Sequence, residues 1–487
     1  MILKTIYNSE GKIKMKNGKK DNMNLKVAYI GGGSRFWAMN LFRELMLEPR
    51  LGGEMRLYDI DKKAAEDNAA LGNMLDEISD HYENGVKHPN NDKIKNNWTY
   101  KAVDDLAQAL KGVDFVFISV LPGTFDEMES DVHVPEKYGI YQSVGDTTGP
   151  GGIIRALRTI PIYEGFAKAI KENCPDAWVI NYTNPMTVCM RTLYKVFPEI
   201  KAFGCCHEVF STQTLMCNAL KDVLGIEDVK RDDLVVNLVG INHFTWITKA
   251  QFGDIDMFDV YRKYIEKHPE GVYKDWGESS MELVKFNLFK RYGVIAAAGD
   301  RHLSEFIPGY QYLNSPEQVE DEWKFFLTTV KSRKEKMARQ FGEREKYLNR
   351  EKRFRVAHTG EESTRQMLAL LGVGDLVTNV NIPNYGQISN LPLGAIVETN
   401  AAFRYGSITP LLAGEIPVGV RSMVLRIVDE QETVVEGALE RDLEKVFRAF
   451  VNNPLVKIPM DQAREMYKEM LNNTKEYLTM YDLSQIQ

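Results

Sequence analysis

The stretch Leu25-Lys26-Val27-Ala28-Tyr29-Ile30-Gly31-Gly32-Gly33-Ser34 decides the expected fold. Its first six residues form an apolar run typical of a buried strand, and three glycines follow directly. A helix is predicted next, over residues 37–45. Glycine allows a tight strand-to-helix turn and close approach of a pyrophosphate, whose charge the helix N-terminus stabilises. The residues predicted to bind a dinucleotide are therefore Gly31, Gly32, Gly33 and Ser34.

An acid lies at the end of the next predicted strand, residues 55–60. Asp59 follows Gly31 by 28 residues, where a carboxylate binds the ribose hydroxyls of adenosine. A carboxylate there would repel a 2′-phosphate, so NAD is favoured over NADP. Phe36 stands in place of the third glycine of the full motif, and an ordinary tight turn is the alternative interpretation.

Alternating strands and helices in the first half predict an α/β fold with a Rossmann-type, doubly wound parallel sheet. The second half mixes a strand at 235–241, a charged helix within 320–352 and a helical tail, which predicts a mixed α+β lobe. The expected division has three parts. Residues 1–24 form a disordered polar leader, and residues 25–200 form an NAD-binding Rossmann domain. Residues 201–487 form an α+β domain for substrate binding, metal binding and oligomerisation.

Charge and cysteine content narrow the partners and the compartment. The net charge of −7 over 487 residues argues against nucleic acid or an anionic membrane as a partner. Five cysteines, an odd number without a framework spacing, fit a reducing compartment, so a cytoplasmic location is expected. No apolar run reaches the roughly 18 residues of a membrane span, and the lysine-rich start lacks the apolar segment of a secretory signal.

A thiol and an imidazole form a candidate metal pair. Cys206 lies in Gly204-Cys205-Cys206-His207-Glu208, and His243 follows in Asn242-His243. A thiolate and a neutral imidazole can hold a divalent ion while leaving positions open for substrate oxygens. The alternatives are an inert packing cysteine and satisfied core histidines.

Three further segments carry polar groups where ligands bind in α/β folds. Asn184-Pro185 ends a predicted strand at the carboxyl edge of the sheet, or else forms an ordinary turn. The glycine-rich residues 145–152 resemble an active-site loop, with a flexible surface loop as the alternative. Gly299-Asp300-Arg301-His302 follows an apolar run that would tune the pKa of a base, unless the segment is a solvated charged turn.

Together these residues resemble glycoside hydrolase family 4, the NAD- and manganese-dependent glycosidases with a lactate/malate-dehydrogenase-like fold. The similarity runs from Lys26 to about Leu471. Its anchors are the 30–34 turn, Gly149-Pro150-Gly151-Gly152, Asn184-Pro185, Cys206, Asn242-His243 and residues 384–392. Residues 142–147, 205–210 and 299–303 look most like the α-galacturonidase branch, which hydrolyses α-D-galacturonides.

The resemblance implies redox-assisted hydrolysis, an exception to the paired-carboxylate mechanism of most glycosidases. On this scheme, NAD would take a hydride from C3 of the sugar, and the ketone would acidify the C2 proton. A base would remove that proton, and Mn²⁺, or another divalent metal, would stabilise the enediolate. The C1 substituent would leave with acid assistance, water would add to C1, and the hydride would return.

The resemblance also implies roles for individual residues. Cys206 and His243 would bind the metal, and Asn184 and Asn242 the substrate. Asp300 would be the C2 base, with Tyr292 as the alternative. The candidate acids are His207 and Asp146. Charge complementarity alone assigns the C6 carboxylate of the sugar to Arg301 and His302.

Several alternatives remain open from sequence. Within the family, an α-glucuronidase or an α-galactosidase is the runner-up. Outside it, the candidates are a plain NAD-dependent dehydrogenase and an NAD-sensing binding module. The expected partner is a small sugar-acid glycoside, and the family likeness implies a homodimer or homotetramer.

Overall fold

The computed structural model describes residues 23–83, 85–88, 94–272 and 280–486. The predicted leader therefore lies outside the described residues, except for its last two. Met23 and Asn24 already belong to the first strand, where they pair with Leu51 and Gly52. The fold thus begins two residues earlier than the sequence predicted.

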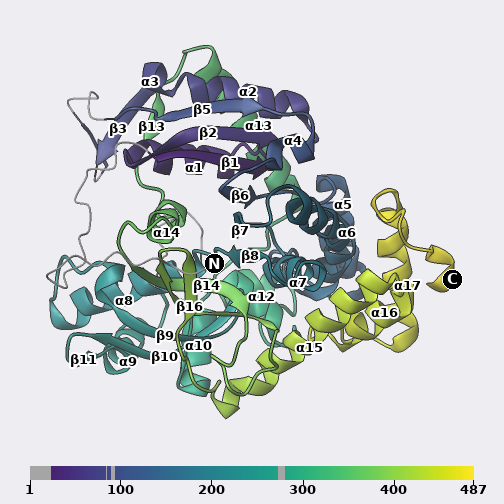
Figure 1. Ribbon diagram of the computed structural model, residues 1–487. Helices are drawn as coiled ribbons and strands as arrows, with labels where there is room; N and C mark the ends of the chain where they lie inside the picture. Colours follow the sequence, from purple (N-terminus) through teal and green to yellow (C-terminus); the bar gives the residue numbers. More distant parts are fainter. Residues whose placement is uncertain (1–22, 84, 89–93, 273–279, 487) are drawn as a thin grey trace, which may run out of the picture.

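Six parallel strands form the centre of the molecule, and their order confirms the predicted Rossmann-type sheet (Figure 1). Their spatial order is β5-β2-β1-β6-β7-β8. Counted along the chain, the third of these six strands lies at one edge and the sixth at the other, as in dinucleotide-binding folds. The strands are β1 (Met23–Ile30), β2 (Leu51–Tyr58), β5 (Trp98–Ala102), β6 (Phe115–Ile118), β7 (Trp178–Asn181) and β8 (Lys201–Gly204).

Both faces of this sheet are buried, because alternate side chains of each strand enter different cores. Val27 and Tyr29 pack with residues of α1 (Trp37–Leu47) and α2 (Lys62–Asn73). Ala28 and Ile30 pack on the opposite face with residues of α4 (Leu106–Leu110), α6 (Gly149–Asn173) and α7 (Met186–Val196). In Figure 1, α15 (Val418–Glu440), α16 (Leu443–Asn452) and α17 (Met460–Asn473) lie beyond α6 and α7.

The sheet continues past the parallel strands with segments from the second half of the chain. The antiparallel strands β14 (Leu376–Pro383), β15 (Ile396–Arg404) and β16 (Ser407–Pro410) follow β8 in that order. Asn381 of β14 pairs with Gly204 of β8. One nine-stranded sheet therefore crosses the division predicted at residue 200.

A second, four-stranded sheet stands beside this one. It consists of β9 (Val235–Ile241), β10 (Phe244–Phe252), β11 (Ile255–Asp256) and β12 (Ile295–Ala296). One of its two apolar faces packs on α8 (Glu208–Leu224), α9 (Met257–Lys267) and α10 (Leu283–Tyr292). The predicted mixed α+β second half is therefore present.

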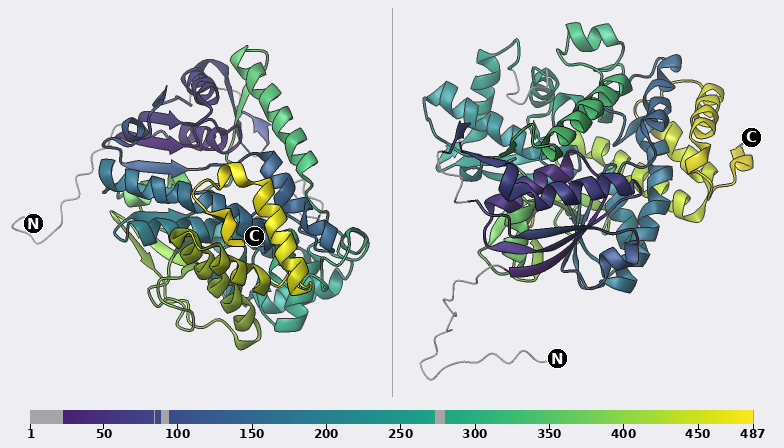
Figure 2. Two further views of the ribbon diagram at one scale, coloured as in Figure 1. Left: turned by 90° about the vertical axis from the view of Figure 1, so that its right-hand side faces the viewer. Right: turned by 90° about the horizontal axis from the view of Figure 1, so that it is seen from above.

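A long helix, α13 (Val330–Leu348), links α5 (Phe125–His133) to α2 (Figure 2). Arg344 in its last part is 2.8 Å from Asp67 of α2. The other elements are α3 (Leu75–Ile78), α11 (Asp300–Leu303), α12 (Pro316–Asp321), α14 (Ser363–Leu370) and a small sheet of β3 (Ser79–Glu83), β4 (Val86–Lys87) and β13 (Phe354–Val356). No helix in the described part of the chain is long and apolar enough to cross a bilayer.

Candidate active site

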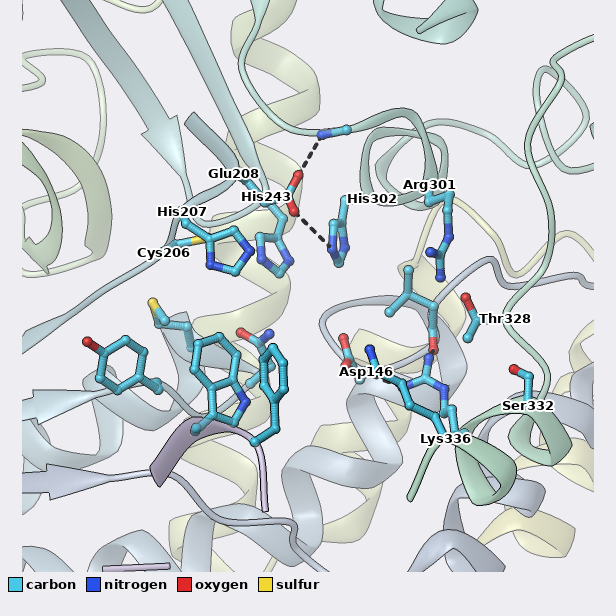
Figure 3. Close-up of a pocket in the computed structure, with 18 of the residues that line it drawn as sticks. Asp146, Cys206, His207, Glu208, His243, Arg301, His302, Thr328, Ser332 and Lys336 are labelled. Carbon is cyan, nitrogen blue, oxygen red and sulfur yellow. Dashed lines mark hydrogen bonds and ion pairs between the residues drawn. The ribbon is translucent and has the colours of Figure 1, made fainter. Parts of the chain in front are cut away.

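A pocket of about 740 Å³ opens at the carboxyl end of the parallel strands (Figure 3). The glycine-turn segment, the β8–α8 connection, the β9–β10 turn, the start of α11 and one face of α13 contribute to its wall. The predicted site residues that line it are Ser34, Asp146, Asn184, Cys206, His207, His243, Asp300, Arg301 and His302. Segments spread over three hundred residues therefore meet in one place.

The glycine turn is close-packed against the neighbouring strand ends. Gly31 has φ +88°, and a Cβ on it would lie 1.9 Å from the Ser119 carbonyl oxygen. The Gly33 N–H donates to Asp59 Oδ2 at 2.8 Å, so the predicted ribose-binding acid is tied to the turn. Among the predicted cofactor residues, Ser34 lines the pocket, whereas the three glycines and Asp59 lie outside its lining.

Aromatic side chains that the sequence analysis did not single out extend the wall from this turn. Trp37, at the start of α1, stacks on Tyr182 with ring centroids 5.3 Å apart. Both rings line the pocket. They give it a flat apolar side next to Ser34.

Cys206 and His243 reach the pocket from two different sheets. Cys206 lies in the β8–α8 connection, and His243 lies in the two-residue turn that joins β9 to β10. His243 has φ +63°, a left-handed conformation that costs a non-glycine residue about 1–2 kcal/mol. Figure 3 shows the Cys206 sulfur and the His243 ring at the same end of the pocket. Such local strain at a pocket favours a functional interpretation of His243.

The surroundings of His243 fit a metal-binding imidazole. Its Nδ1 lies 3.0 Å from Thr147 Oγ1, and that hydroxyl donates to Asp146 Oδ1, also at 3.0 Å. An Nδ1–H that donates to Thr147 presents Nε2 as the ligating atom, the arrangement usual for metal-bound histidines. The described residues contain no cluster of three or more His, Cys, Asp or Glu side chains suited to a metal. A cation held by this pair would therefore take further ligands from water or substrate oxygens.

Two other groups at this end fit the same interpretation. Burial raises the pKa of the Cys206 thiol well above its usual value, and Glu398 and Glu208 add to this effect. A thiolate there therefore needs a compensating cation. Asn184 Oδ1 is buried and has no hydrogen-bond partner among the described residues, while the Asn184 carbonyl accepts from Arg155 Nε at 3.0 Å. The amide oxygen is thus available to a ligand.

Asp300, the predicted base, is fully buried at the start of α11. Its two oxygens accept the N–H groups of Val284 and Lys285 at 3.1 and 2.9 Å, which caps α10. Burial raises the pKa of Asp300, the Glu282 carboxylate raises it further, and Lys285 opposes both. A carboxyl group with a raised pKa suits general acid–base chemistry.

Asp146, one candidate acid, is held in its charged form. Burial alone would raise the pKa of Asp146, but Arg333 and Arg155 lower it below the usual value. Arg333 Nη1 lies 3.9 Å from Asp146 Oδ2, and Arg333 Nη2 donates to the Val144 carbonyl at 2.5 Å. A permanent carboxylate accepts hydrogen bonds well but is a poor proton donor.

His302 does not carry the charge on which its predicted role depended. Burial, together with His243, whose ring centroid is 3.8 Å away, lowers its pKa to about 3. A neutral imidazole offers no charge to a substrate carboxylate. Glu208, which the sequence analysis did not single out, accepts the Gly299 N–H at 2.8 Å and lies 4.0 Å from His302 Nε2.

The remaining predicted residues lie at the edge of the pocket or outside it. His207 is half-exposed, with Nδ1 3.1 Å from Glu361 Oε1. Asn242 is fully buried and outside the lining. Tyr292 is also outside it: its hydroxyl is 3.1 Å from Arg291 Nη2, and its ring packs on Trp246. Tyr292 is the last residue of α10, at the opposite end from the turn that Asp300 caps, so the structure argues against it as a base.

Known proteins resemble the chain over nearly its full length. A protein of Thermoanaerobacterium saccharolyticum named α-galacturonidase is 56% identical over 93% of this chain and 96% of its own. An α-galacturonidase of Bacillus subtilis is 47% identical over 92% and 97%. The crystal structure of a Bacillus subtilis protein described as a glucosidase matches with a TM-score of 0.84 at 46% identity, over 92% of this chain and 100% of that one.

Two models of one family together span most of the chain. The model described as family 4 glycosyl hydrolase matches residues 26–222, and the model of its C-terminal domain matches residues 238–456. The pocket described above draws its residues from both segments. The resemblance predicted from sequence is therefore confirmed: the chain belongs to family 4 of the glycosyl hydrolases.

Proposed function

We propose that the protein is an α-galacturonidase that hydrolyses α-D-galacturonides with the help of NAD and Mn²⁺. The observation that carries the substrate class is the charge distribution of the pocket. Arg301 and Lys336 lie at the end across from Cys206 and His243 (Figure 3). Arg333 also lines the pocket, and its Nη1 lies 3.9 Å from Asp146 Oδ2. A uronic acid differs from the neutral sugar by a carboxylate, and arginine binds planar carboxylates well. The α-galacturonidase relatives support the same substrate.

The cofactors follow from the two halves of the pocket. The Gly31 turn and Ser34 would receive the NAD pyrophosphate, and Cys206 and His243 would hold the divalent ion. A 6-phospho-α-glucosidase from gut microorganisms, solved with NAD and Mn²⁺, shares the fold with a TM-score of 0.75 at 19% identity, over 93% of this chain and 99% of that one. When bound, NAD exchanges a hydride with C3 and the ion acts as a Lewis acid toward sugar oxygens.

The chain's own side chains would orient the sugar and move its protons. Asn184 Oδ1, which is buried and unbonded among the residues described, would accept a hydrogen bond from a ring hydroxyl. Asp300 would take the C2 proton, because its buried carboxylate has a raised pKa. Asp146, held as a carboxylate, suits a hydroxyl acceptor better than an acid, and His207 remains the other candidate acid. Trp37 and Tyr182 would exclude water from the cofactor side.

A panel of p-nitrophenyl α-glycosides tests this function. The galacturonide should be cleaved with the highest kcat/KM, only with NAD, Mn²⁺ and reductant present, and without net accumulation of NADH. Preference for the glucuronide or galactoside would support the alternatives within the family. Steady NADH formation would indicate a plain dehydrogenase. Product formed in D₂O should carry deuterium at C2, and its absence there would refute the elimination mechanism.

The compartment and the assembly belong to the same proposal. All five cysteines are unpaired, which suits a reducing cytoplasm. A homodimer or homotetramer is expected from the family, and light scattering at micromolar concentration tests it. A monomer with full activity would contradict that expectation.

A further inference from the structure

One fully buried carboxylate, Glu398, has no part in the chemistry proposed above. It lies on β15, with 1% of its surface exposed. Thr245 Oγ1 donates to its Oε2, and its Oε1 accepts from Asn379 and Asn381 Nδ2 at 3.0 and 3.1 Å. A buried carboxylate is costly unless it is well hydrogen-bonded. Its retention next to a pocket raises the question of what it holds in place.

The first arm of this network leads to the metal-pair histidine. Thr245 belongs to β10, two residues after His243, and its hydroxyl also lies 2.8 Å from the Ile241 carbonyl oxygen. The hydroxyl therefore spans the strained two-residue turn that presents the His243 ring. Glu398 anchors that turn from the neighbouring sheet.

The second arm leads to the metal-pair cysteine. Asn379 Nδ2 donates not only to Glu398 but also to the Cys206 carbonyl oxygen, at 3.0 Å. Across β14 and β15, Asn381 faces Glu398 and Asn379 faces Asn400, so these side chains share one face of the sheet. The same face meets the second sheet, where Asn400 Nδ2 donates to the Val236 carbonyl at 2.6 Å. Glu398 is therefore connected through Asn379 to the backbone of Cys206, and through Thr245 to the turn that presents His243.

We infer that Glu398 is a positioning residue that fixes the separation of Cys206 and His243 and thereby sets the affinity for a divalent cation. The inference rests on the proposed function for the presence of that cation. The two ligands come from different sheets. Hydrogen bonds of Glu398 reach the backbone of Cys206 through Asn379 on one side and Thr245 on the other, so they link the two sheets where these meet. Ligating atoms must be held within about half an ångström of their productive positions.

Binding of Mn²⁺ to the intact protein tests this role, because the electron paramagnetic resonance signal of free Mn²⁺ is lost on binding. Glu398→Ala removes both arms and is expected to weaken Mn²⁺ binding about 10- to 100-fold, the usual cost of losing an outer partner of a metal ligand. Glu398→Gln is expected to stay within about threefold of the wild type, since its amide still accepts from the asparagines and donates to Thr245.

Glu430→Ala is the matched control. Glu430 is also buried, but it lies on α15, outside the lining of the pocket. Its carboxylate accepts a hydrogen bond from Asn453 Nδ2 at 2.8 Å. Its loss should lower the melting temperature without changing the dissociation constant for Mn²⁺. A purely structural role of Glu398 predicts the same pattern for Glu398→Ala.

The inference is overturned if folded Glu398→Ala binds Mn²⁺ within twofold of the wild type. Thr245→Val breaks one arm with little change of shape, so it decides the matter if Glu398→Ala does not fold. Unchanged Mn²⁺ binding by folded Thr245→Val then overturns the inference. Failure of the wild type itself to bind Mn²⁺, with or without NAD, would instead overturn the proposed cofactor.

Discussion

Replacing Arg333 with methionine is expected to remove most of the preference for a charged sugar. Arg333 reaches the pocket from α13, and its side chain is 17% exposed. The Val144 carbonyl and Asp146 hold two of its nitrogens, while the buried Nε has no hydrogen-bond partner in the part of the chain that the structure describes. A guanidinium fixed in this way, with a donor to spare, can receive the C6 carboxylate without further reordering.

The size of the effect follows from the bond that is lost. A hydrogen bond to a charged group contributes about 1.5–3 kcal/mol, which corresponds to roughly a 10- to 150-fold fall in kcat/KM for the galacturonide. Asp146 loses its neutralising neighbour at the same time and would repel the substrate carboxylate, which favours the upper part of this range. The corresponding α-D-galactoside has no carboxylate, so its kcat/KM should change less than about threefold.

The assay compares both p-nitrophenyl glycosides at saturating NAD and Mn²⁺. Lys334→Gln is the matched control, because it removes one charge from the same helix at a residue outside the lining of the pocket. Lys334 is exposed and pairs with Asp126 at 2.6 Å. Equal losses for both substrates with Arg333→Met, or equal effects of the two variants, would refute a carboxylate-binding role for Arg333.

Three further changes test the turn, the imidazole and a buried acid. Gly31→Ala should weaken NAD binding at least about tenfold by calorimetry, because the new Cβ would lie 1.9 Å from the Ser119 carbonyl oxygen. Thr147→Val should weaken Mn²⁺ binding about 10- to 100-fold, since the histidine loses its hydroxyl partner. Burial raises the pKa of Glu430 from 4.5 to about 8. The folded state therefore binds this proton more tightly than the unfolded state does. The contribution of Glu430 to the free energy of unfolding is complete below pH 4.5, and it falls by about 1.4 kcal/mol per pH unit up to about pH 8. Glu430→Gln should remove that slope from the denaturant-unfolding free energy.

For each of these three predictions, one result would contradict the stated reason. Gly165→Ala places a methyl group in open space on α6, so it should leave NAD binding unchanged. Equal NAD affinity of the two glycine variants would contradict the role of the turn. If Thr147→Val bound Mn²⁺ with unaltered affinity, the Thr147 hydroxyl would have no role in metal binding. Parallel pH profiles of Glu430→Gln and the wild type would show that Glu430 does not titrate in this range.

The sequence predicted the parts of the site that local chemistry marks. A strand followed by three glycines can form few structures, and β1 and its turn confirm the prediction. Asn184 ends a predicted strand and Asp146 lies in a glycine-rich segment, and parallel strands bring such ends to one edge. Residues of this kind can be found because the rule that places them depends only on their own neighbours in the chain.

For other residues of the site, no local sequence pattern predicts the position or the charge of the side chain. Arg333 lies in a stretch of alternating charges that predicts a solvated helix, and no local pattern tells which of its cations faces the pocket. Charge complementarity alone assigned His302 to the sugar carboxylate, yet burial next to His243 lowers the pKa of His302 and keeps it neutral. Tyr292 ends a helix whose orientation depends on packing against the second sheet. In each case the outcome depends on a contact distant in sequence.

The deepest difference concerns the division into two domains. Sequence periodicity places a boundary near residue 200, because the regular alternation of strands and helices ends there. In the structure, β14 and β15 instead extend the parallel sheet, and β15 contacts the hairpin formed by β9 and β10. Cys206 leaves the sheet at that edge, and His243 enters from the facing hairpin, so the pair forms where the two sheets meet. A cation site at this joint needs a link across it, and the buried bonds of Glu398 supply one. Mutations that loosen β14 or β15 should therefore reduce metal affinity before they affect NAD binding, which depends on the opposite, self-contained part of the sheet.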